Sequence, residues 1–414
     1  MIDRLVKLEI GGSVQKVRLC ARLDGLPPIL IVQAGPGLPL LNEVTRFQER
    51  FRLEEDFLVA YWDQRGCGDA SRRDAECVSF ERQTDDLCFV AQWLKTETGQ
   101  KPSLFGVSVG ATICLQAAER LSSVITSIVA VSADLDASAS DSSAESFLKR
   151  RMSREKFARV AKKIVSPINP ADFQLRARLL SDFGGFERGK NFGKQSYEMV
   201  VSLIRGYGLA GAVRSLRNMN AVQRKLLPEL STLNLFTDWP RPTMPIHYVF
   251  GQKDPLCPPS SIESLSSVVK ESDTLTLLPD ASHMAHFDEV AAVRSVIARM
   301  HMKTLKFRRN LVEKILEGSK AVTWRLFDDK DLRVGDRLEM VDSEDGTRFA
   351  EADIVALEEK PLGTVSDDDL AENGYRDRDE VLEVNRKLYG ERVTAETLVK
   401  IVRFRLQKPD DLAG

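Results

Sequence analysis

Histidine and closely spaced cysteine are both scarce in this sequence, which has four histidines and six cysteines with no CxxC pair among 414 residues. The scattered cysteines exclude a zinc-finger or disulfide framework and favour reduced thiols in a cytoplasm. No apolar run reaches the length of a membrane span, and the opening segment, MIDRLVKLEI, has no signal-peptide core. We therefore expect a cytoplasmic protein that uses no metal, no cofactor and no membrane.

The sequence also lacks a strong charge of either sign, because 59 basic residues oppose 61 acidic ones. A hydrophobic content of 43% is that of a soluble globular protein, and the length suffices for two domains with their own cores. Strand and helix patterning starts afresh after Met300. We therefore expect one domain over residues 1–300 and a second over residues 301–414.

The first 300 residues alternate between two kinds of pattern. Helical spacing of apolar residues covers 82–94, about 109–121 and 260–269. Short apolar runs that predict buried strands cover 29–33, 57–62, 103–105, 125–132, 245–250 and 273–278. This alternation predicts a parallel sheet wound with helices. Between about residues 133 and 239 the chain becomes polar and helical, which predicts a cap inserted over the active-site end of the sheet.

One serine stands in the setting of a catalytic nucleophile. The motif Gly106-Val107-Ser108-Val109-Gly110 follows a predicted strand and precedes a predicted helix, as a nucleophile elbow requires. A Gly-rich turn beside a core serine is the alternative interpretation. If Ser108 is the nucleophile, the tetrahedral intermediate needs two N–H donors. We expect them from Val109, directly after the serine, and from Gly35 in the loop after the first buried strand.

A nucleophilic serine needs a base and an acid that orients the base. Asp254 and His283 each follow a predicted strand, in the chain order Ser, Asp, His that α/β-hydrolases use. His286 is the rival base and Asp280 the rival acid, whereas His247 lies inside a strand and is expected to be a core residue. We therefore predict a triad of Ser108, Asp254 and His283.

Five segments in order, QAGPG, YWDQRGCG, LFGVSVGA, VFGQKDPLCP and SHMAHFDE, resemble the proline iminopeptidase branch of the α/β-hydrolases, serine aminopeptidase family S33. The resemblance implies the same triad, Gly35 as an oxyanion donor, and a short-peptide or small-molecule substrate. Gln33 replaces the family histidine and GVSVG replaces GGSWG, so strict N-terminal-proline specificity is not implied. The family binds the free amine with cap glutamates, for which the candidates here are Glu187, Glu198 and Glu229.

The C-terminal 114 residues have the pattern of a small β-rich domain. The segment ILEGSKAVTWR followed by LRVGD resembles the ASCH domain, a small β-barrel related to PUA RNA-binding domains. The resemblance implies a nucleotide or RNA ligand, and some ASCH proteins hydrolyse N4-acetylcytidine. It places a ligand site at Lys320, Thr323 and Arg325. The resemblance does not fix the acidic residue of this site. Glu372 is one candidate, and Asp377 and Asp379 are the alternatives.

Charge in this second domain limits the choice of ligand. Residues 301–414 hold 21 Lys and Arg against 26 Asp and Glu. A surface that binds long RNA should be basic, so a nucleotide-sized ligand is favoured. A binding role is favoured over a catalytic one because a resemblance in fold does not by itself carry activity. The leading hypothesis for the whole chain is an aminopeptidase-type serine hydrolase with an accessory ASCH domain. The alternatives are an esterase or amidase acting on small non-peptide substrates, and an RNA- or nucleotide-binding protein that uses the hydrolase half as a scaffold.

Overall fold

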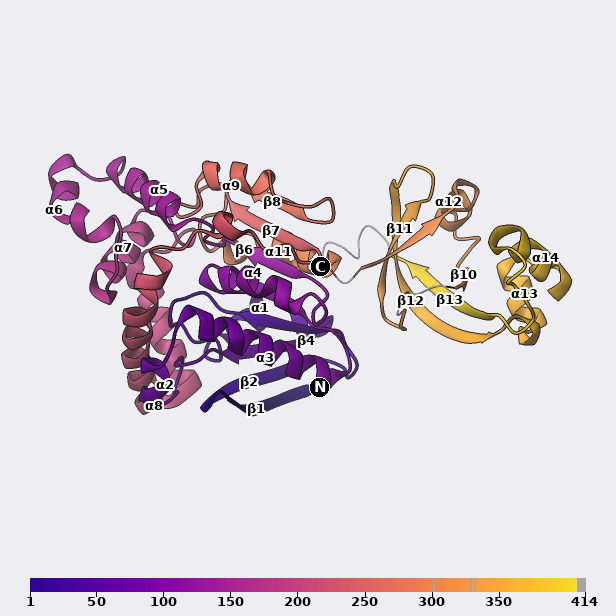
Figure 1. Ribbon diagram of the computed structural model, residues 1–414, viewed down its shortest axis with the longest axis horizontal. Helices are drawn as coiled ribbons and strands as arrows, with labels where there is room; N and C mark the ends of the chain where they lie inside the picture. The colour runs from indigo at the N-terminus through magenta and orange to yellow at the C-terminus, as the bar shows by residue number, and fades with distance from the viewer. Residues whose placement is uncertain (301, 328–329, 331, 408–414) are drawn as a thin grey trace. The chain divides into compact units, whose positions relative to one another are not determined.

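The computed structural model describes residues 1–300, 302–327, 330 and 332–407. The chain divides into two compact units, Met1–Met300 and His301–Gly414. Figure 1 shows an α/β unit with additional helices and a separate, smaller unit built on a curled sheet.

The first unit contains a mixed eight-stranded sheet with the order β1-β2-β4-β3-β5-β6-β7-β8. Its strands are β1 (Ile2–Ile10), β2 (Ser13–Ala21), β3 (Pro28–Val32), β4 (Leu58–Asp63), β5 (Ser103–Val107), β6 (Ile128–Val131), β7 (Ile246–Gly251) and β8 (Thr274–Leu278). From β4 to β8 all neighbouring strands are parallel, whereas β1, β2 and β4 pair antiparallel. The sheet strands expected from the apolar runs are therefore present, within a few residues at their ends.

The β1–β2 hairpin is an addition to the predicted sheet. Alternating apolar and polar residues form its two strands, which is the pattern of a half-buried strand. The turn between them uses Gly11 and Gly12, both with positive φ. The alternation and the glycine pair were therefore a recognisable hairpin signal that the search for continuous apolar runs missed.

Helices cover both faces of this sheet because each central strand buries alternate residues on opposite sides. Leu30 and Val32 pack with one apolar cluster, whereas Ile29 and Ile31 pack with the other. The helices of the first cluster are α3 (Phe80–Thr98), α4 (Val109–Leu121) and α9 (Pro259–Ser266). Those of the second are α1 (Val44–Phe51), α10 (Ala285–Asp288) and α11 (Val290–Arg299).

Four helices lie between β6 and β7, in the segment expected to form a cap. They are α5 (Ala137–Lys149), α6 (Arg154–Ile164), α7 (Pro170–Asp182) and α8 (Phe192–Leu230). Helix α8 is interrupted at Gly208, whose φ of 70° is not helical. The last part of α8 packs against α2 (Arg72–Glu76) through an apolar cluster of its own. The rest of the connections hold two short 3-10 helices, Leu53–Glu55 and Leu235–Asp238.

The second unit is a curled five-stranded sheet with the order β10-β13-β12-β11-β9. Its strands are β9 (Lys303–Phe307), β10 (Val322–Leu326), β11 (Arg337–Asp342), β12 (Arg348–Pro361) and β13 (Leu398–Leu406). Its helices are α12 (Arg309–Leu316), α13 (Asp367–Asn373) and α14 (Arg378–Tyr389), with a 3-10 turn at Leu362–Thr364. One apolar cluster lies with α12, and a second packs against α13 and α14. The shape is consistent with a small barrel domain.

Candidate active site

Ser108 occupies a sharp turn between β5 and α4. Its φ of 51° and ψ of −124° lie outside the regions that side-chain-bearing residues prefer. On both sides of this turn, the backbone lies very close to other segments of the protein. A Cβ on Gly106 would lie 2.7 Å from the Cα atom of Ala111, and one on Gly110 would overlap the carbonyl oxygens of Val32 and Gln33. The two glycines of the motif therefore permit the strained turn that presents the serine.

The structure joins Ser108, His283 and Asp254 in one hydrogen-bonded chain. The Oγ atom of Ser108 lies 2.9 Å from Nε2 of His283, and Nδ1 of His283 lies 2.9 Å from Oδ2 of Asp254. All three residues are buried, with 8%, 4% and 6% of their surfaces exposed in that order. Burial alone would lower the pKa of His283. The charge and hydrogen bond of Asp254 outweigh burial and raise that pKa above its ordinary value.

The rival residues lie elsewhere. His286 is fully buried in a cluster of phenylalanine rings, where burial holds its pKa well below the ordinary value. Asp280 forms an exposed ion pair with Lys253 at 2.6 Å. His247 is half-buried rather than in the core, and its Nδ1 lies 2.9 Å from Oγ1 of Thr274. The geometry therefore favours His283 and Asp254 over these alternatives.

The two expected oxyanion donors are neighbours. A Cβ on Gly35 would lie 3.8 Å from Cβ of Val109, so the loop after β3 passes directly beside the start of α4. Val109 is the first residue of α4, where backbone N–H groups have no acceptor within the helix. Both positions are thus suited to stabilising charge that develops near Ser108.

Asp63, at the end of β4, holds this loop in place. Its Oδ1 accepts the backbone N–H groups of Leu40 at 2.7 Å and Leu41 at 2.9 Å. Its Oδ2 accepts the hydroxyl of Tyr207 in α8 at 2.6 Å. The carboxylate therefore ties the loop that carries Gly35 to the added helices. Sequence reasoning did not single out Asp63, although its place directly after a buried strand could have indicated it.

A cavity of about 1740 Å³ opens at the triad and extends beneath the added helices. Of the three glutamates considered for amine binding, Glu187 and Glu198 line it and Glu229 does not. Glu229 instead accepts the backbone N–H of Phe80 at 2.8 Å. Burial raises the pKa of Glu187, but Arg46 and Lys190 outweigh burial and hold that pKa below its usual range. Both oxygens of Glu187 accept from Arg46 at 2.7 Å.

The candidate residues of the second unit contact separate protein groups. Lys320 donates to Oδ1 of Asn373 at 2.8 Å, and burial lowers its pKa, with smaller effects of Lys314 and Arg325. Thr323 is buried, with 6% of its surface exposed. Arg325 donates to the carbonyl of Lys306 at 3.0 Å and lies over the ring of Phe307.

Arg325 therefore spans the distance between β10 and β9, the two outer strands of the described sheet. Its side chain links these two strands, which do not pair with each other in the described sheet. Arg325 therefore has a structural role. Lys320 and Arg325 are close enough for their charges to interact. Thr323 and Arg325 both belong to β10, so their two-residue spacing puts them on the same face of that strand.

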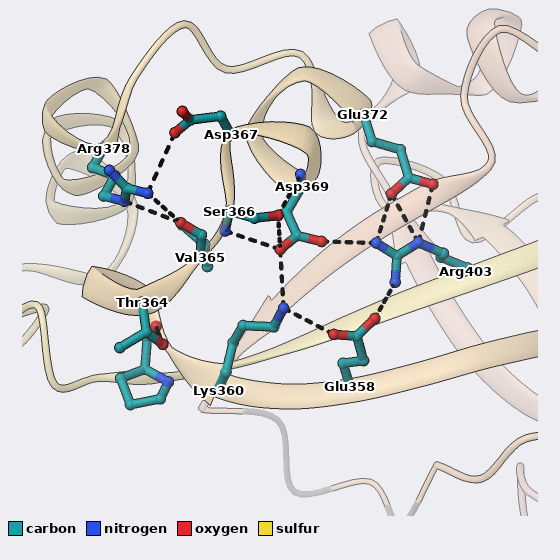
Figure 2. A network of polar contacts seen from close by, with 11 residues as sticks. Glu358, Lys360, Thr364, Val365, Ser366, Asp367, Asp369, Glu372, Arg378 and Arg403 are labelled. Carbon is teal, nitrogen blue, oxygen red and sulfur yellow. Dashed lines mark hydrogen bonds and ion pairs between the residues drawn. The ribbon is translucent and has the colours of Figure 1, made fainter.

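Glu372 belongs to a different cluster, which Figure 2 shows in detail. Arg403 of β13 donates from Nε to Glu372 at 2.8 Å, from Nη2 to Asp369 at 2.8 Å and from Nη1 to Glu358 at 2.7 Å. Lys360 adds ion pairs to Asp369 at 2.9 Å and Glu358 at 2.8 Å. This network fastens α13 to the sheet and engages the carboxylate of Glu372.

The alternative carboxylates lie on or beside α14. Asp377 caps that helix by accepting the N–H of Glu380 at 2.9 Å, and Asp379 is exposed in its first turn. In the part of the chain that the structure describes, no group of three or more His, Cys, Asp or Glu residues is arranged to hold a metal ion. No helix among these residues is both long and apolar enough to cross a membrane.

The parallel sheet with its elbow, and the neighbouring histidine and aspartate, define an α/β-hydrolase architecture. The chain belongs to the alpha/beta hydrolase fold family, which matches residues 27–290. It is a hydrolase, as the sequence motifs predicted.

Among individual proteins, the chain is similar to probable aminopeptidase YbaC of Bacillus subtilis (strain 168). The two are 23% identical over 306 residues, which cover 71% of this chain and 94% of that protein. The fold resembles the proline iminopeptidase of Mycobacterium smegmatis, with a TM-score of 0.52, 18% identity and coverage of 72% of this chain and 98% of that one. It also resembles a proline iminopeptidase-related protein of Thermus thermophilus, with a TM-score of 0.50, 18% identity and coverage of 72% and 97%.

Proposed function

We propose that the first unit is a serine hydrolase in which Ser108 is the nucleophile, His283 the base and Asp254 the residue that orients the base. The observation that carries this proposal is the unbroken hydrogen-bonded chain from Ser108 to Asp254 on a strained elbow. The alternative of a Gly-rich turn beside a core serine gives no reason for a buried histidine and aspartate in line with the hydroxyl.

The geometry supports an acyl-enzyme mechanism. His283 Nε2 takes the proton of Ser108 as Oγ attacks the substrate carbonyl carbon. The backbone N–H groups of Gly35 and Val109 stabilise the negative oxygen of the tetrahedral intermediate. His283 then gives the proton to the leaving group, whose bond to the carbonyl carbon breaks. Water repeats these steps on the acyl-enzyme and releases the acid.

We propose an aminopeptidase-type activity on short peptides or amino-acid amides as the substrate class. Its support is the sequence resemblance and the similarity to a protein named as a probable aminopeptidase. An esterase or amidase acting on small non-peptide substrates is the second candidate. The neutralised Glu187 favours that second candidate, because the carboxylate is already bound to Arg46 and Lys190.

Two experiments on the intact chain test these proposals. Labelling by a fluorophosphonate probe that Ser108→Ala abolishes supports the nucleophile, and equal labelling of the variant contradicts it. A panel of aminoacyl amides, peptides and simple esters then separates the substrate classes. Turnover of esters alone contradicts the aminopeptidase proposal and leaves the serine hydrolase proposal standing.

For the second unit we propose a ligand-binding role rather than catalysis, with a nucleotide as the ligand class. It rests on the ASCH resemblance and on the half-buried ammonium group of Lys320, whose pKa is lowered by burial. Titration of the intact chain with cytidine derivatives and a short RNA tests it. Weaker binding to Lys320→Ala supports the proposal, and identical binding contradicts it. A cytoplasmic location likewise stays a prediction from the scattered cysteines.

A further inference from the structure

Asp134 lies at the active-site edge of the sheet but has no part in the triad. It follows β6, which runs between β5 and β7. Those two strands lead to Ser108 and Asp254, and the carboxyl ends of parallel strands meet at one edge. Asp134 and His283 both line the large cavity, and the charge of Asp134 helps to raise the pKa of His283. The carboxyl group is therefore close to the reacting atoms.

The carboxyl group of Asp134 is only partly engaged by the protein. Its Oδ1 accepts the hydroxyl of Ser140 at 2.7 Å, and its Oδ2 accepts no hydrogen bond from the described residues. The charged groups that face it are Arg176, Asp141 and His283. Arg176 forms an ion pair with Asp141, so these two charges offset each other. Burial raises the pKa of Asp134 to about 6, and the carboxyl group is mostly ionised at neutral pH.

Ser132 supplies a second, independent sign of a ligand at this place. Its φ of 50° is unusual for a residue with a side chain, and only 1% of its surface is exposed. Its Oγ lacks a hydrogen-bond partner among the described residues, although the residue lines the same cavity. A buried hydroxyl without a partner is unfavourable. A ligand that donates hydrogen bonds in this part of the cavity would satisfy it.

The two glutamates considered for amine binding that line the cavity are already neutralised. Glu187 is bound by Arg46 and Lys190, and Glu198 is bound by Lys190 at 2.6 Å. In an aminoacyl substrate the α-ammonium is attached to the carbon next to the carbonyl that Ser108 attacks. Its partner must therefore lie near the nucleophile, at the edge of the sheet. Asp134 meets that condition and keeps an oxygen available.

We propose that Asp134 and Ser132 form the subsite that binds the protonated α-amine of an aminoacyl substrate. Oδ2 of Asp134 accepts a charge-assisted hydrogen bond from the ammonium, and Oγ of Ser132 accepts a second one. The inference rests on the proposed serine hydrolase activity and names the residues that would recognise an aminoacyl substrate. It replaces the cap glutamates by a carboxylate in the loop that directly follows β6.

The test compares two substrates that differ only in the α-amine, the alanine and propionate esters of one alcohol. The readout is the ratio of their kcat/KM values on the intact chain. We expect Asp134→Asn to lower the alanyl-to-propionyl ratio about 10- to 100-fold, because the negative charge that strengthens the hydrogen bond to the ammonium is lost. Glu198→Gln removes the same charge elsewhere in the cavity and should change the ratio less than about 2-fold. In the parent chain the ratio should also fall as the pH drops through about 6, and this dependence should vanish in Asp134→Asn.

An unchanged ratio in Asp134→Asn, or a larger loss in Glu198→Gln, overturns the inference while leaving the triad proposal intact. A binding measurement makes the test independent of turnover. Alaninamide should bind the Ser108→Ala chain more tightly than propionamide does, and the further change Asp134→Asn should remove the difference. If the parent chain hydrolyses neither ester, the proposed function fails, and this binding difference still supports or overturns the amine subsite.

Discussion

The two units of this chain differ in where their candidate residues direct their hydrogen bonds. In the first unit, Ser108 and His283 are 175 residues apart in sequence, yet they bond to each other beside a large cavity. In the second unit, Lys320 bonds to Asn373 and Glu372 bonds to Arg403. Candidate residues that bond to one another indicate a catalytic site. Candidate residues that each bond to a different protein group also stabilise the fold. Substitutions in each unit test that contrast.

The largest expected effect is on catalysis in the first unit. His283→Ala should lower kcat by about 10³-fold or more, because among the described residues only His283 forms a side-chain hydrogen bond with the Ser108 hydroxyl. His286→Phe keeps a ring in the aromatic cluster and serves as the matched control. Steady-state kinetics on one ester substrate measure both. Similar losses in the two variants would move the role of base away from His283.

The next largest expected effect is on the stability of the first unit, through Asp63. Asp63→Ala leaves the N–H groups of Leu40 and Leu41 without their acceptor and should lower the free energy of unfolding by about 2–4 kcal/mol. Tyr207→Phe removes only one of the three hydrogen bonds and should cost about 1 kcal/mol. Urea unfolding measures both costs. Equal stability of Asp63→Ala and the parent chain would show that the loop does not depend on this carboxylate.

The second unit should respond to a change in its polar network through stability and not through hydrolysis. Asp369 is buried, and Ser366, Lys360 and Arg403 outweigh the effect of burial and lower its pKa. Asp369→Ala should destabilise the second unit by about 2 kcal/mol, because a buried acceptor of four donors is lost. Hydrogen exchange of α13 and ester hydrolysis, measured on the same sample, test this. A loss of hydrolysis without faster exchange would contradict the separation of roles.

The pH dependence of catalysis gives a finer test. Asp254 raises the pKa of His283, and the base is active only when neutral. Activity should therefore fall as the pH drops through a value above 6.5, the ordinary pKa of histidine. Propionate ester is the substrate of choice, because it has no amine that titrates or binds Asp134. An acid limb of kcat/KM centred well below 6.5 would contradict the raised pKa.

The smallest expected effect is on hydrolysis in Lys320→Ala. The unit that contains Lys320 contributes no residue to the hydrogen-bonded chain of Ser108, His283 and Asp254. Ester hydrolysis should therefore change less than about 2-fold. Initial rates on the intact chain measure it. A loss of 10-fold or more would show that the two units act together.

Much of the fold follows from the sequence because its signals are local. Strands β3 to β7 are short apolar runs, since strands covered by helices on both sides need apolar residues at nearly every position. The β1–β2 hairpin and α13 went unpredicted although their signals were present. The first had alternating residues around Gly11-Gly12, and the second had the capping box of Ser366 and Asp369.

Only the site residues that chain order and the ends of strands indicate could be predicted from the sequence. Ser108, Asp254 and His283 each follow a strand, so their meeting could be expected. The ion pair between Arg46 and Glu187 could not, because these residues are 141 positions apart and no spacing rule links them. Pairing of this kind decides which carboxylate stays available to a substrate, and it is set by tertiary packing.

Fluorophosphonate labelling of the intact chain, followed by peptide mapping, tests the assignment of the nucleophile most directly. We predict a single labelled position, Ser108, with no labelling in Ser108→Ala and strongly reduced labelling in His283→Ala. Circular dichroism shows whether both variants keep the parent fold. Labelling at another residue, or equal labelling of a folded Ser108→Ala chain, would contradict that assignment.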